Sequence, residues 1–333
     1  MSTLVIAEVG VNHDGDLAKA LELVAAASEV GADVCKFQMF EANELSTEAA
    51  PKALYQLRKT RPEESQFEML SRLSLSRDEF LAIKDECDSH HIEFLCTAFD
   101  PASLREMAGL GMRRIKIPSG EITNLPLLRA TQGYRLPILL STGMSSLPEV
   151  GDALKILNSC VAGSREVTVL HCTSQYPAPV SSVNLKAMVT MRNDLHVPVG
   201  YSDHTLGWEV PVAAVALGAS VIEKHLTLDS TATGPDHAAS LEPDQFAEMV
   251  RAIRTTETSL GDGIKLPHPA EEDVKRIARR SVVARHPIPQ GHVLTADDLA
   301  VKRPGEGVSP MLWDTIIGSR AVRSFERDEA IEL

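Results

Sequence analysis

The chain has 333 residues, of which 44% are hydrophobic and 24% are charged, and its formal net charge is −13. This composition is typical of a globular protein with a large core, and an acidic chain without a Lys/Arg-rich run is not expected to bind nucleic acid. No apolar run approaches the ~20 residues that span a membrane, and residues 1–10 lack the features of a signal peptide. We therefore expect a cytoplasmic protein with no membrane segment.

Short runs rich in Val and Ile alternate with helical patterns along the first 260 residues. A capping box at residues 76–79, for example, marks the start of one helix. Eight alternating units predict an α/β fold, the (β/α)₈ TIM barrel. A doubly wound open sheet is the alternative, but no Gly-rich dinucleotide fingerprint follows the first strand. The predicted strands are residues 4–10, 34–40, 93–99, 114–119, 137–143, 167–173, 198–204 and 221–227.

Two segments depart from this alternation. Residues 41–75 form a long connection between the second and third strands, and such an insertion beside a barrel mouth often covers an active site. After a barrel domain at 1–262, residues 263–275 read as a linker rich in Gly, Pro and charge. Residues 276–333 then predict a small β-rich second domain, whose limited core favours docking on another surface.

The five cysteines are odd in number and none forms a CxxC pair. Cys35, Cys96 and Cys172 fall inside apolar strand-like runs, where a thiol behaves as a small hydrophobic group. The sequence therefore predicts neither a disulfide framework nor a structural zinc site.

Polar residues gather at the carboxyl ends of the predicted strands, where barrel enzymes place their catalytic groups. Side chains two positions apart share a face of a strand, as in the pairs Lys36/Gln38, Ser202/His204 and Glu223/His225. The set comprises Glu8, Lys36, Gln38, Thr97, Lys116, Ser119, Glu121, Ser202, His204, Glu223 and His225.

His204 and His225 end neighbouring strands, and two neutral imidazoles suit a divalent ion such as Zn²⁺, Mn²⁺ or Co²⁺. Two protein ligands leave coordination positions open for substrate and water, as catalysis requires. The alternative is that each histidine simply bonds a backbone carbonyl at a strand end.

Lys36 and Lys116, with serine hydroxyls beside them, can bind a phosphate or carboxylate through charge-assisted hydrogen bonds. The alternatives are lysines that extend to solvent at the barrel rim, or a Schiff-base lysine, for which Lys224 is a further candidate. Tyr176 lines a sugar pocket or packs its loop. Asp236 holds a sugar hydroxyl or is an exposed loop acid.

Several motifs together carry a family resemblance over essentially the whole chain. They are AEVGVNHDG, KFQ, KIPSGE, LSTGM, HCTSQYPAP, GYSDHT, EKHLTLD, GPDHAASLEP and KRPGEG. This series resembles the sialic acid synthase family, which includes N-acetylneuraminate, legionaminate and pseudaminate synthases. The tail is similar to the antifreeze-like SAF domain, a β-clip fold.

The resemblance implies a transferase that condenses phosphoenolpyruvate with an N-acetylated mannosamine-type sugar. The products are a nine-carbon 2-keto acid and phosphate, which leaves by C–O cleavage. The family implies a divalent metal, Mn²⁺ first with Mg²⁺ or Co²⁺ as alternatives. It also implies a domain-swapped homodimer in which each SAF domain caps the partner's barrel.

The resemblance also assigns roles to individual residues of this chain. His204 and His225 match metal ligands, and Arg303 matches an arginine that crosses the dimer to the sugar's N-acetyl group. Glu8, Gln38, Tyr176 and Asp236 match sugar-contacting positions. Glu121 lies by the metal and its water, and Glu223 lines the same cavity. We predict Glu121, Glu8 and Gln38 as catalytic. The positions that match the phosphoenolpyruvate site are Lys36, Thr97, Lys116, Ser119 and Ser202, with Ser174 where some members have an asparagine.

The sugar and two rival functions stay open at this point. HCTSQYPAP and GDGIK lean slightly towards legionaminate-type enzymes. The two candidate sugar substrates are N-acetylmannosamine and 2,4-diacetamido-2,4,6-trideoxymannose. One rival is a Schiff-base aldolase that uses pyruvate. The other is a non-catalytic sugar-binding or ice-binding protein, suggested only by the tail.

Overall fold

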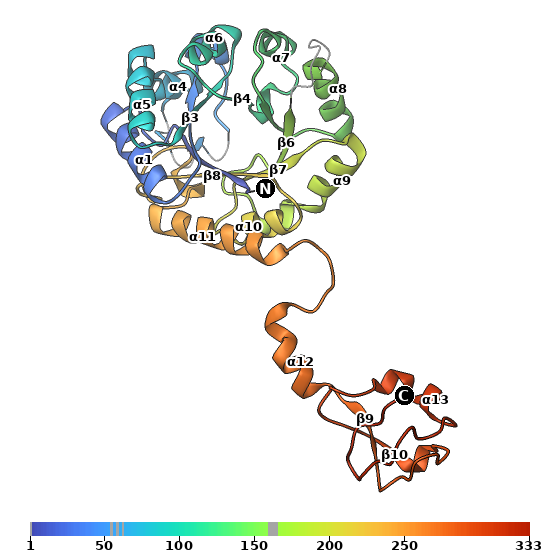
Figure 1. The fold of residues 1–333 in the computed structure, drawn as a ribbon. Coiled ribbons are helices and arrows are strands. Elements are labelled where there is room, and N and C mark those ends of the chain that lie inside the picture. The colour runs from blue at the N-terminus through green and yellow to red at the C-terminus, as the bar shows by residue number, and fades with distance from the viewer. Residues whose placement is uncertain (1, 54–55, 58–59, 62, 159–165) are drawn as a thin grey trace. The chain divides into compact units, whose positions relative to one another are not determined.

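The computed structural model describes residues 2–53, 56–57, 60–61, 63–158 and 166–333 (Figure 1). The chain divides into two compact units, Met1–Gly261 and Asp262–Leu333. Each unit has a hydrophobic core of its own.

Eight parallel strands close into a barrel in chain order, and β1 pairs with β8 to complete it. Their Val/Ile/Leu-rich sequences suit strands that are buried on both faces. The predicted (β/α)₈ barrel is confirmed, and each strand falls within the range predicted for it. The strands are β1 (Leu4–Gly10), β2 (Val34–Met39), β3 (Glu93–Ala98), β4 (Ile115–Ile117), β5 (Ile138–Ser141), β6 (Val167–Cys172), β7 (Val199–Asp203) and β8 (Val221–His225).

Helices surround the barrel (Figure 1). The capping box predicted at Ser76 is present, because its side chain accepts from the Glu79 N–H and Glu79 bonds back to it. Asp100 caps another helix start, directly before a proline. The helices are α1 (Leu17–Glu29), α5 (Arg77–Ser89), α6 (Pro101–Gly109), α7 (Leu125–Ala130), α8 (Leu147–Asn158), α9 (Lys186–Leu195), α10 (Glu209–Ala216) and α11 (Pro243–Leu260).

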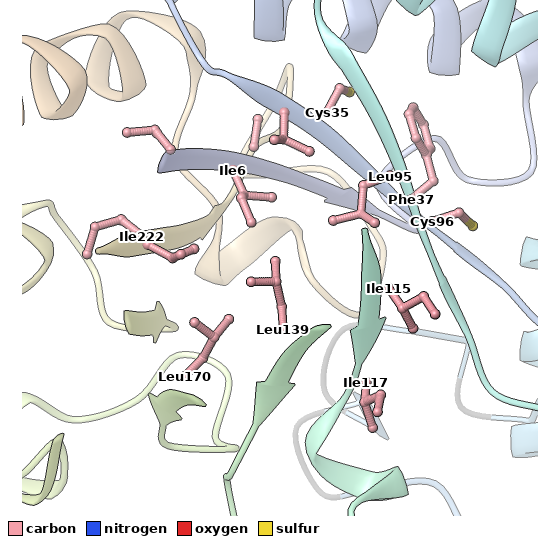
Figure 2. Close-up of a cluster of buried hydrophobic side chains, with 14 of the residues drawn as sticks. Ile6, Cys35, Phe37, Leu95, Cys96, Ile115, Ile117, Leu139, Leu170 and Ile222 are labelled. Atoms are coloured by element: carbon pink, nitrogen blue, oxygen red, sulfur yellow. The ribbon is translucent and has the colours of Figure 1, made fainter. Parts of the chain in front are cut away.

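Apolar side chains fill the barrel below its polar mouth. Ile6, Leu95, Leu139 and Leu170 are buried in this cluster (Figure 2). Because side chains alternate along a strand, the residue two positions further on shares the same face. Those next residues are polar or sulfur-containing in all four strands: Glu8, Thr97, Ser141 and Cys172.

The second unit is small and β-containing, as predicted. Strands β9 (Ser281–Ala284) and β10 (Leu299–Lys302) form an antiparallel pair. Helix α12 (Glu272–Ala278) begins inside residues 263–275, so part of the segment expected to be a linker is helical. A short helix, α13 (Trp313–Ile316), contributes Ile316 to a core built around Phe325.

Within the described residues, no helix has both the length and the apolar character that crossing a membrane requires. The cytoplasmic location stays a prediction. Four cysteines are buried and unpaired: Cys35, Cys87, Cys96 and Cys172. The fifth, Cys160, lies outside the described residues.

Candidate active site

A cavity of about 500 Å³ opens at the carboxyl ends of the barrel strands. Lateral neighbours in the sheet explain why the polar side chains converge there, since Glu8 is in register with Lys36 and Ser202 with Glu223. The predicted residues that line the cavity are Glu8, Lys36, Gln38, Thr97, Lys116, Ser119, Ser174, Tyr176, Ser202, His204, Glu223, His225 and Asp236.

Two lysines and two glutamates form a buried network of alternating charge at the base of this cavity. Lys36 Nζ lies 2.6 Å from Glu8 Oε2 and 3.6 Å from Glu223 Oε2. Lys116 Nζ lies 3.1 Å from Glu223 Oε1. We call these four residues the charged quartet. Its charges balance, which offsets the cost of removing four ions from water.

Neutral side chains orient the charged quartet. Gln38 Nε2 donates to Glu8 Oε1 at 2.7 Å, and Ser202 Oγ donates to Glu223 Oε1 at 2.9 Å. Lys36 Nζ donates to Thr97 Oγ1 at 3.1 Å. The predicted polar residues therefore position one another through direct hydrogen bonds.

The quartet perturbs the pKa values of its own members in opposite directions. Burial alone would raise the pKa of Glu223, but Lys116 and Lys36 outweigh burial and lower that pKa to about 2. The pKa of Glu8 is raised, chiefly by burial. Burial lowers the pKa of Lys116, whereas in Lys36 the Glu223 and Glu8 charges outweigh burial and raise the pKa. Lys36 is thus the more firmly protonated of the two lysines.

His204 and His225 face each other at the mouth, with ring centroids 5.5 Å apart. Burial lowers the pKa of His204 to about 4 and that of His225 well below its usual value, so both rings are neutral at physiological pH. His204 Nδ1 lies 2.8 Å from the Thr173 carbonyl, which can only accept, so its proton is on Nδ1 and Nε2 has a free lone pair. The Tyr176 ring packs 4.1 Å from the His204 ring.

The histidine pair fits a divalent metal ion. His225 Nδ1 is buried and has no hydrogen-bond partner among the described residues, and Asp236 Oδ2 is 3.9 Å away. Neutral imidazoles with free nitrogens are the state that binds metal. No group of three or more His, Cys, Asp or Glu side chains that could hold a metal occurs in the described part of the chain. The protein would therefore supply two ligands and leave the other positions open.

Hydroxyl groups surround the side of the cavity between β4, β5 and β6. Ser119 Oγ accepts from the Gly143 N–H at 2.9 Å and lies 3.1 Å from Cys172 Sγ. A Cβ atom at Gly143 would come within 2.2 Å of Ser174 Oγ and 2.9 Å of Ser119 Oγ, so the chain needs glycine there. This packing brings the Ser119 and Ser174 hydroxyls together.

Ser141 is a cavity residue that the sequence analysis did not single out. Its Oγ is buried and has no partner within the described residues, and it lines the cavity. The signal was present, because Ser141 ends β5 and has the same place on its strand as Thr97 has near the end of β3.

An apolar surface forms the opposite side of the cavity, and we call it the apolar wall. Phe40 and Phe99 meet edge to face with centroids 6.0 Å apart. Leucines from α2 (Ala42–Leu45) and α4 (Gln66–Leu73) complete it, so the long connection does line the cavity as predicted. The wall comprises Val11, Phe40, Leu45, Met69, Leu70, Leu73 and Phe99.

Two predicted site residues lie elsewhere. Glu121 is absent from the described cavity lining; it is the last residue of a short helix after β4, η1 (Ser119–Glu121), whose first residue does line the cavity. Its Oε2 instead accepts from Asn124 Nδ2 at 2.6 Å. Arg303 is exposed in the second unit, just after β10, and the barrel unit forms its cavity without it. The proposed roles of both residues stay predictions.

Lys224 points away from the cavity, as the alternation of β8 predicts. Its ammonium group is fully buried and pairs with Asp203 at 2.6 Å. It is therefore not available as a Schiff-base lysine at this site.

Comparison with known proteins agrees with this arrangement. Residues 23–265 match the NeuB family and residues 279–332 match the SAF domain. The chain belongs to the NeuB family. The predicted resemblance to sialic acid synthases and the predicted SAF domain are confirmed.

The NeuB-family relatives match nearly the whole chain. The N,N'-diacetyllegionaminic acid synthase of Legionella pneumophila is 44% identical over 322 residues, 96% of this chain and 90% of the relative. The synthase of that name from Campylobacter jejuni is 44% identical over 332 residues, 99% of this chain and 98% of the relative. The crystal structure of N-acetylneuraminic acid synthetase from Leptospira borgpetersenii, solved with citrate, has a TM-score of 0.74 and 33% identity. That match covers 82% of this chain and 90% of the other. The chain is accordingly an enzyme of the synthase type.

Proposed function

We propose that this NeuB-family enzyme condenses phosphoenolpyruvate with 2,4-diacetamido-2,4,6-trideoxymannose, giving N,N'-diacetyllegionaminic acid and phosphate. The observation that carries the proposal is one cavity in which buried lysines, two neutral histidines and an apolar wall converge. Relatives with the corresponding name, 44% identical over nearly the whole chain, support it.

Phosphoenolpyruvate would bind at the charged quartet. Its carboxylate and phosphate are anions, and Lys36 and Lys116 are the buried cations that face the cavity. Ser119, Ser141 and Ser202 add hydroxyl donors around them. Glu8 and Glu223 pair with these lysines, so a bound anion would take over part of their hydrogen bonding.

His204 and His225 would hold a divalent ion, Mn²⁺ first with Mg²⁺ or Co²⁺ as alternatives, which when bound polarises the sugar aldehyde. Glu8 and Gln38 would hold sugar hydroxyls, and Asp236 would do so from the β8 loop. With the aldehyde fixed, C3 of phosphoenolpyruvate attacks it. Water then adds at C2, and phosphate leaves with cleavage of the C–O bond.

The apolar wall favours the trideoxy sugar over N-acetylmannosamine. A methyl at C6 and acetamido methyls lose little by leaving water for apolar surface, whereas a hydroxymethyl group loses hydrogen bonds there. Among the described residues that line the cavity, the only lysines or arginines are Lys36 and Lys116, which the proposal assigns to phosphoenolpyruvate, so neither is left to bind a phosphorylated sugar.

We also propose a homodimer in which the SAF domains are exchanged and Arg303 reaches the partner's cavity. The second unit leaves apolar side chains exposed that a partner would cover. They are Ile264, Leu266, Val274, Ile277 and Met311.

Incubation of the purified protein with phosphoenolpyruvate and each sugar tests the reaction. We expect phosphate release with both sugars, faster with the trideoxy sugar, and loss of activity in EDTA that Mn²⁺ restores. Phosphoenolpyruvate labelled with ¹⁸O in its bridging position should give labelled phosphate.

The outcomes separate the rivals. If neither sugar leads to phosphate release, the proposal is contradicted and the non-catalytic binding protein becomes the remaining alternative. Borohydride trapping of pyruvate on a lysine would support the aldolase. That is not expected, because Lys36 and Lys116 are both held by carboxylates.

A further inference from the structure

A buried ion pair lies directly behind the histidine pair, on the outer face of the barrel. Asp203 and Lys224 are register partners on β7 and β8, and both side chains are fully buried. His204 follows Asp203, and His225 follows Lys224. Because side chains alternate along a strand, each histidine lies on the opposite face from the charged residue before it.

Lys224 contacts the residues on both sides of His204. Its Nζ lies 2.6 Å from Asp203 Oδ2 and also donates to the Thr205 carbonyl oxygen. A single side chain of β8 therefore bonds the carboxylate of the residue before His204 and the backbone carbonyl of the residue after it. The next residue along β8 is the other histidine, His225.

Asp203 completes this arrangement from β7. Its Oδ1 accepts from the Tyr201 hydroxyl at 2.9 Å and from the Thr205 N–H at 3.1 Å, and the Thr205 hydroxyl lies 3.0 Å from both carboxylate oxygens. These bonds turn the chain immediately after His204. The carboxylate is not part of the described cavity lining, and its bonds tie the Tyr201, Thr205 and Lys224 side chains and the Thr205 N–H together behind His204.

The small net stabilisation expected of a buried ion pair suggests that the Asp203–Lys224 pair has a role other than stability. A buried ion pair is often no more stabilising than apolar residues of the same size, because both ions lose their hydration. Its directional bonds, however, fix geometry in a way that apolar contacts do not. The groups whose geometry it fixes are the two strand ends that carry His204 and His225.

We propose that Lys224 is a positioning residue that sets the separation and orientation of the His204 and His225 rings. The inference rests on the proposed function insofar as those rings bind the metal. It explains why β8 carries a third ionisable residue that does not face the cavity. It also predicts that loss of the pair loosens metal binding without touching the substrate-binding lysines.

The test uses the double variant Asp203→Asn/Lys224→Met, which leaves no unpaired buried charge. The control is Glu93→Gln/Arg114→Met, which removes a partly buried pair at 2.6 Å between the first residue of β3 and the residue before β4, at the opposite strand ends from the histidines. Mn²⁺ binding is followed by electron paramagnetic resonance, and the ring ¹⁵N signals of His204 and His225 by NMR without metal. Denaturation curves measure stability.

We expect the double variant to bind Mn²⁺ about 10- to 100-fold more weakly and the control to stay within about twofold of the unaltered enzyme. The ring signals of His204 and His225 should shift in the double variant alone. If the double variant does not fold, Thr205→Val, which removes only the hydroxyl bonds to Asp203, should weaken Mn²⁺ binding by a smaller factor.

Equal Mn²⁺ affinity in the altered and unaltered proteins, or an equal loss in the control, would overturn the inference. If the unaltered enzyme bound no divalent ion, the proposed metal role would fail by itself. The ring signals would then decide the positioning role: unchanged signals in the double variant, or in Thr205→Val, refute it, and shifts confined to these two rings support it.

Discussion

The charged quartet and the apolar wall line one cavity but are built in different ways. The quartet comes from four strand ends whose side chains bind one another through ion pairs of 2.6 to 3.6 Å. The wall comes largely from the long connection after β2 and from packing between apolar side chains. Under the proposed function, the quartet would bind phosphoenolpyruvate and the wall would select the sugar.

Removal of one cation from the quartet should have the largest effect. Lys36→Met leaves Glu8 and Glu223 with less compensation, and a broken buried pair costs about 3–5 kcal/mol of stability. Loss of a preorganised charge at the anion site should lower kcat/KM by about 1000-fold or more. Denaturation and phosphate-release assays measure both effects.

The double variant Lys36→Met/Glu8→Gln separates these two consequences. It should recover part of the stability and none of the activity. Recovery of activity would contradict the placement of phosphoenolpyruvate at Lys36.

In the metal-free protein, the lowered pKa of His204 should make the free energy of unfolding depend on pH. The pKa of His204 is about 4 when folded, against 6.5 for a free histidine. The unfolded chain therefore takes up the proton first, and the free energy of unfolding falls as pH drops from 6.5 to 4. This difference amounts to roughly 3 kcal/mol at the acid end.

His204→Gln should reduce the slope of the stability curve between pH 6.5 and 4 without abolishing it, because His225 and His13 also have lowered pKa values. Urea denaturation across that range measures the change. Leu70→Asn, in the wall, serves as the control and should leave the slope unchanged. A slope equal to that of the unaltered protein would show that His204 does not contribute to the proton uptake.

A change in the wall should have the smallest effect and should fall on the sugar alone. Leu70→Asn places an amide against the cavity, so KM for the trideoxy sugar should rise about tenfold while KM for phosphoenolpyruvate holds. Discrimination against N-acetylmannosamine should shrink. Leu81→Asn, at an exposed leucine of α5, is the control. Equal changes in both KM values would show that the wall does not select the sugar.

The sequence predicted that the members of the quartet gather at the strand ends, because both determinants of their placement are local, but it did not predict the ion pairs between them. Apolar runs mark the strands, and period-two alternation then places Glu8, Lys36 and Glu223 on the inner face. The rule does not place Glu121, because it holds only while the strand continues and β4 ends at Ile117. Ser141 was missed because its segment reads equally well as a turn.

The wall and the ion pair behind the histidines were harder to predict from sequence. The long connection was expected to cover the site, but which of its leucines face the cavity depends on how α2 and α4 fold back. Likewise, the alternation of side chains predicted that Lys224 faces away from the cavity. Its pairing with Asp203, in contrast, depends on the stagger between β7 and β8. Neither the packing of α2 and α4 nor the stagger between β7 and β8 can be predicted from one local segment of the sequence.

Gly143 limits how this enzyme can be re-engineered. The side chains of the apolar wall can be shortened, lengthened or made polar by substitution. A library of variants aimed at new sugars can therefore change these residues one at a time. At Gly143 even one added carbon meets Ser174, Ser119 and Cys172 at once. Substitution of Gly143 therefore requires a change at Ser174 first, and Ser119 and Cys172 have to be varied together with it.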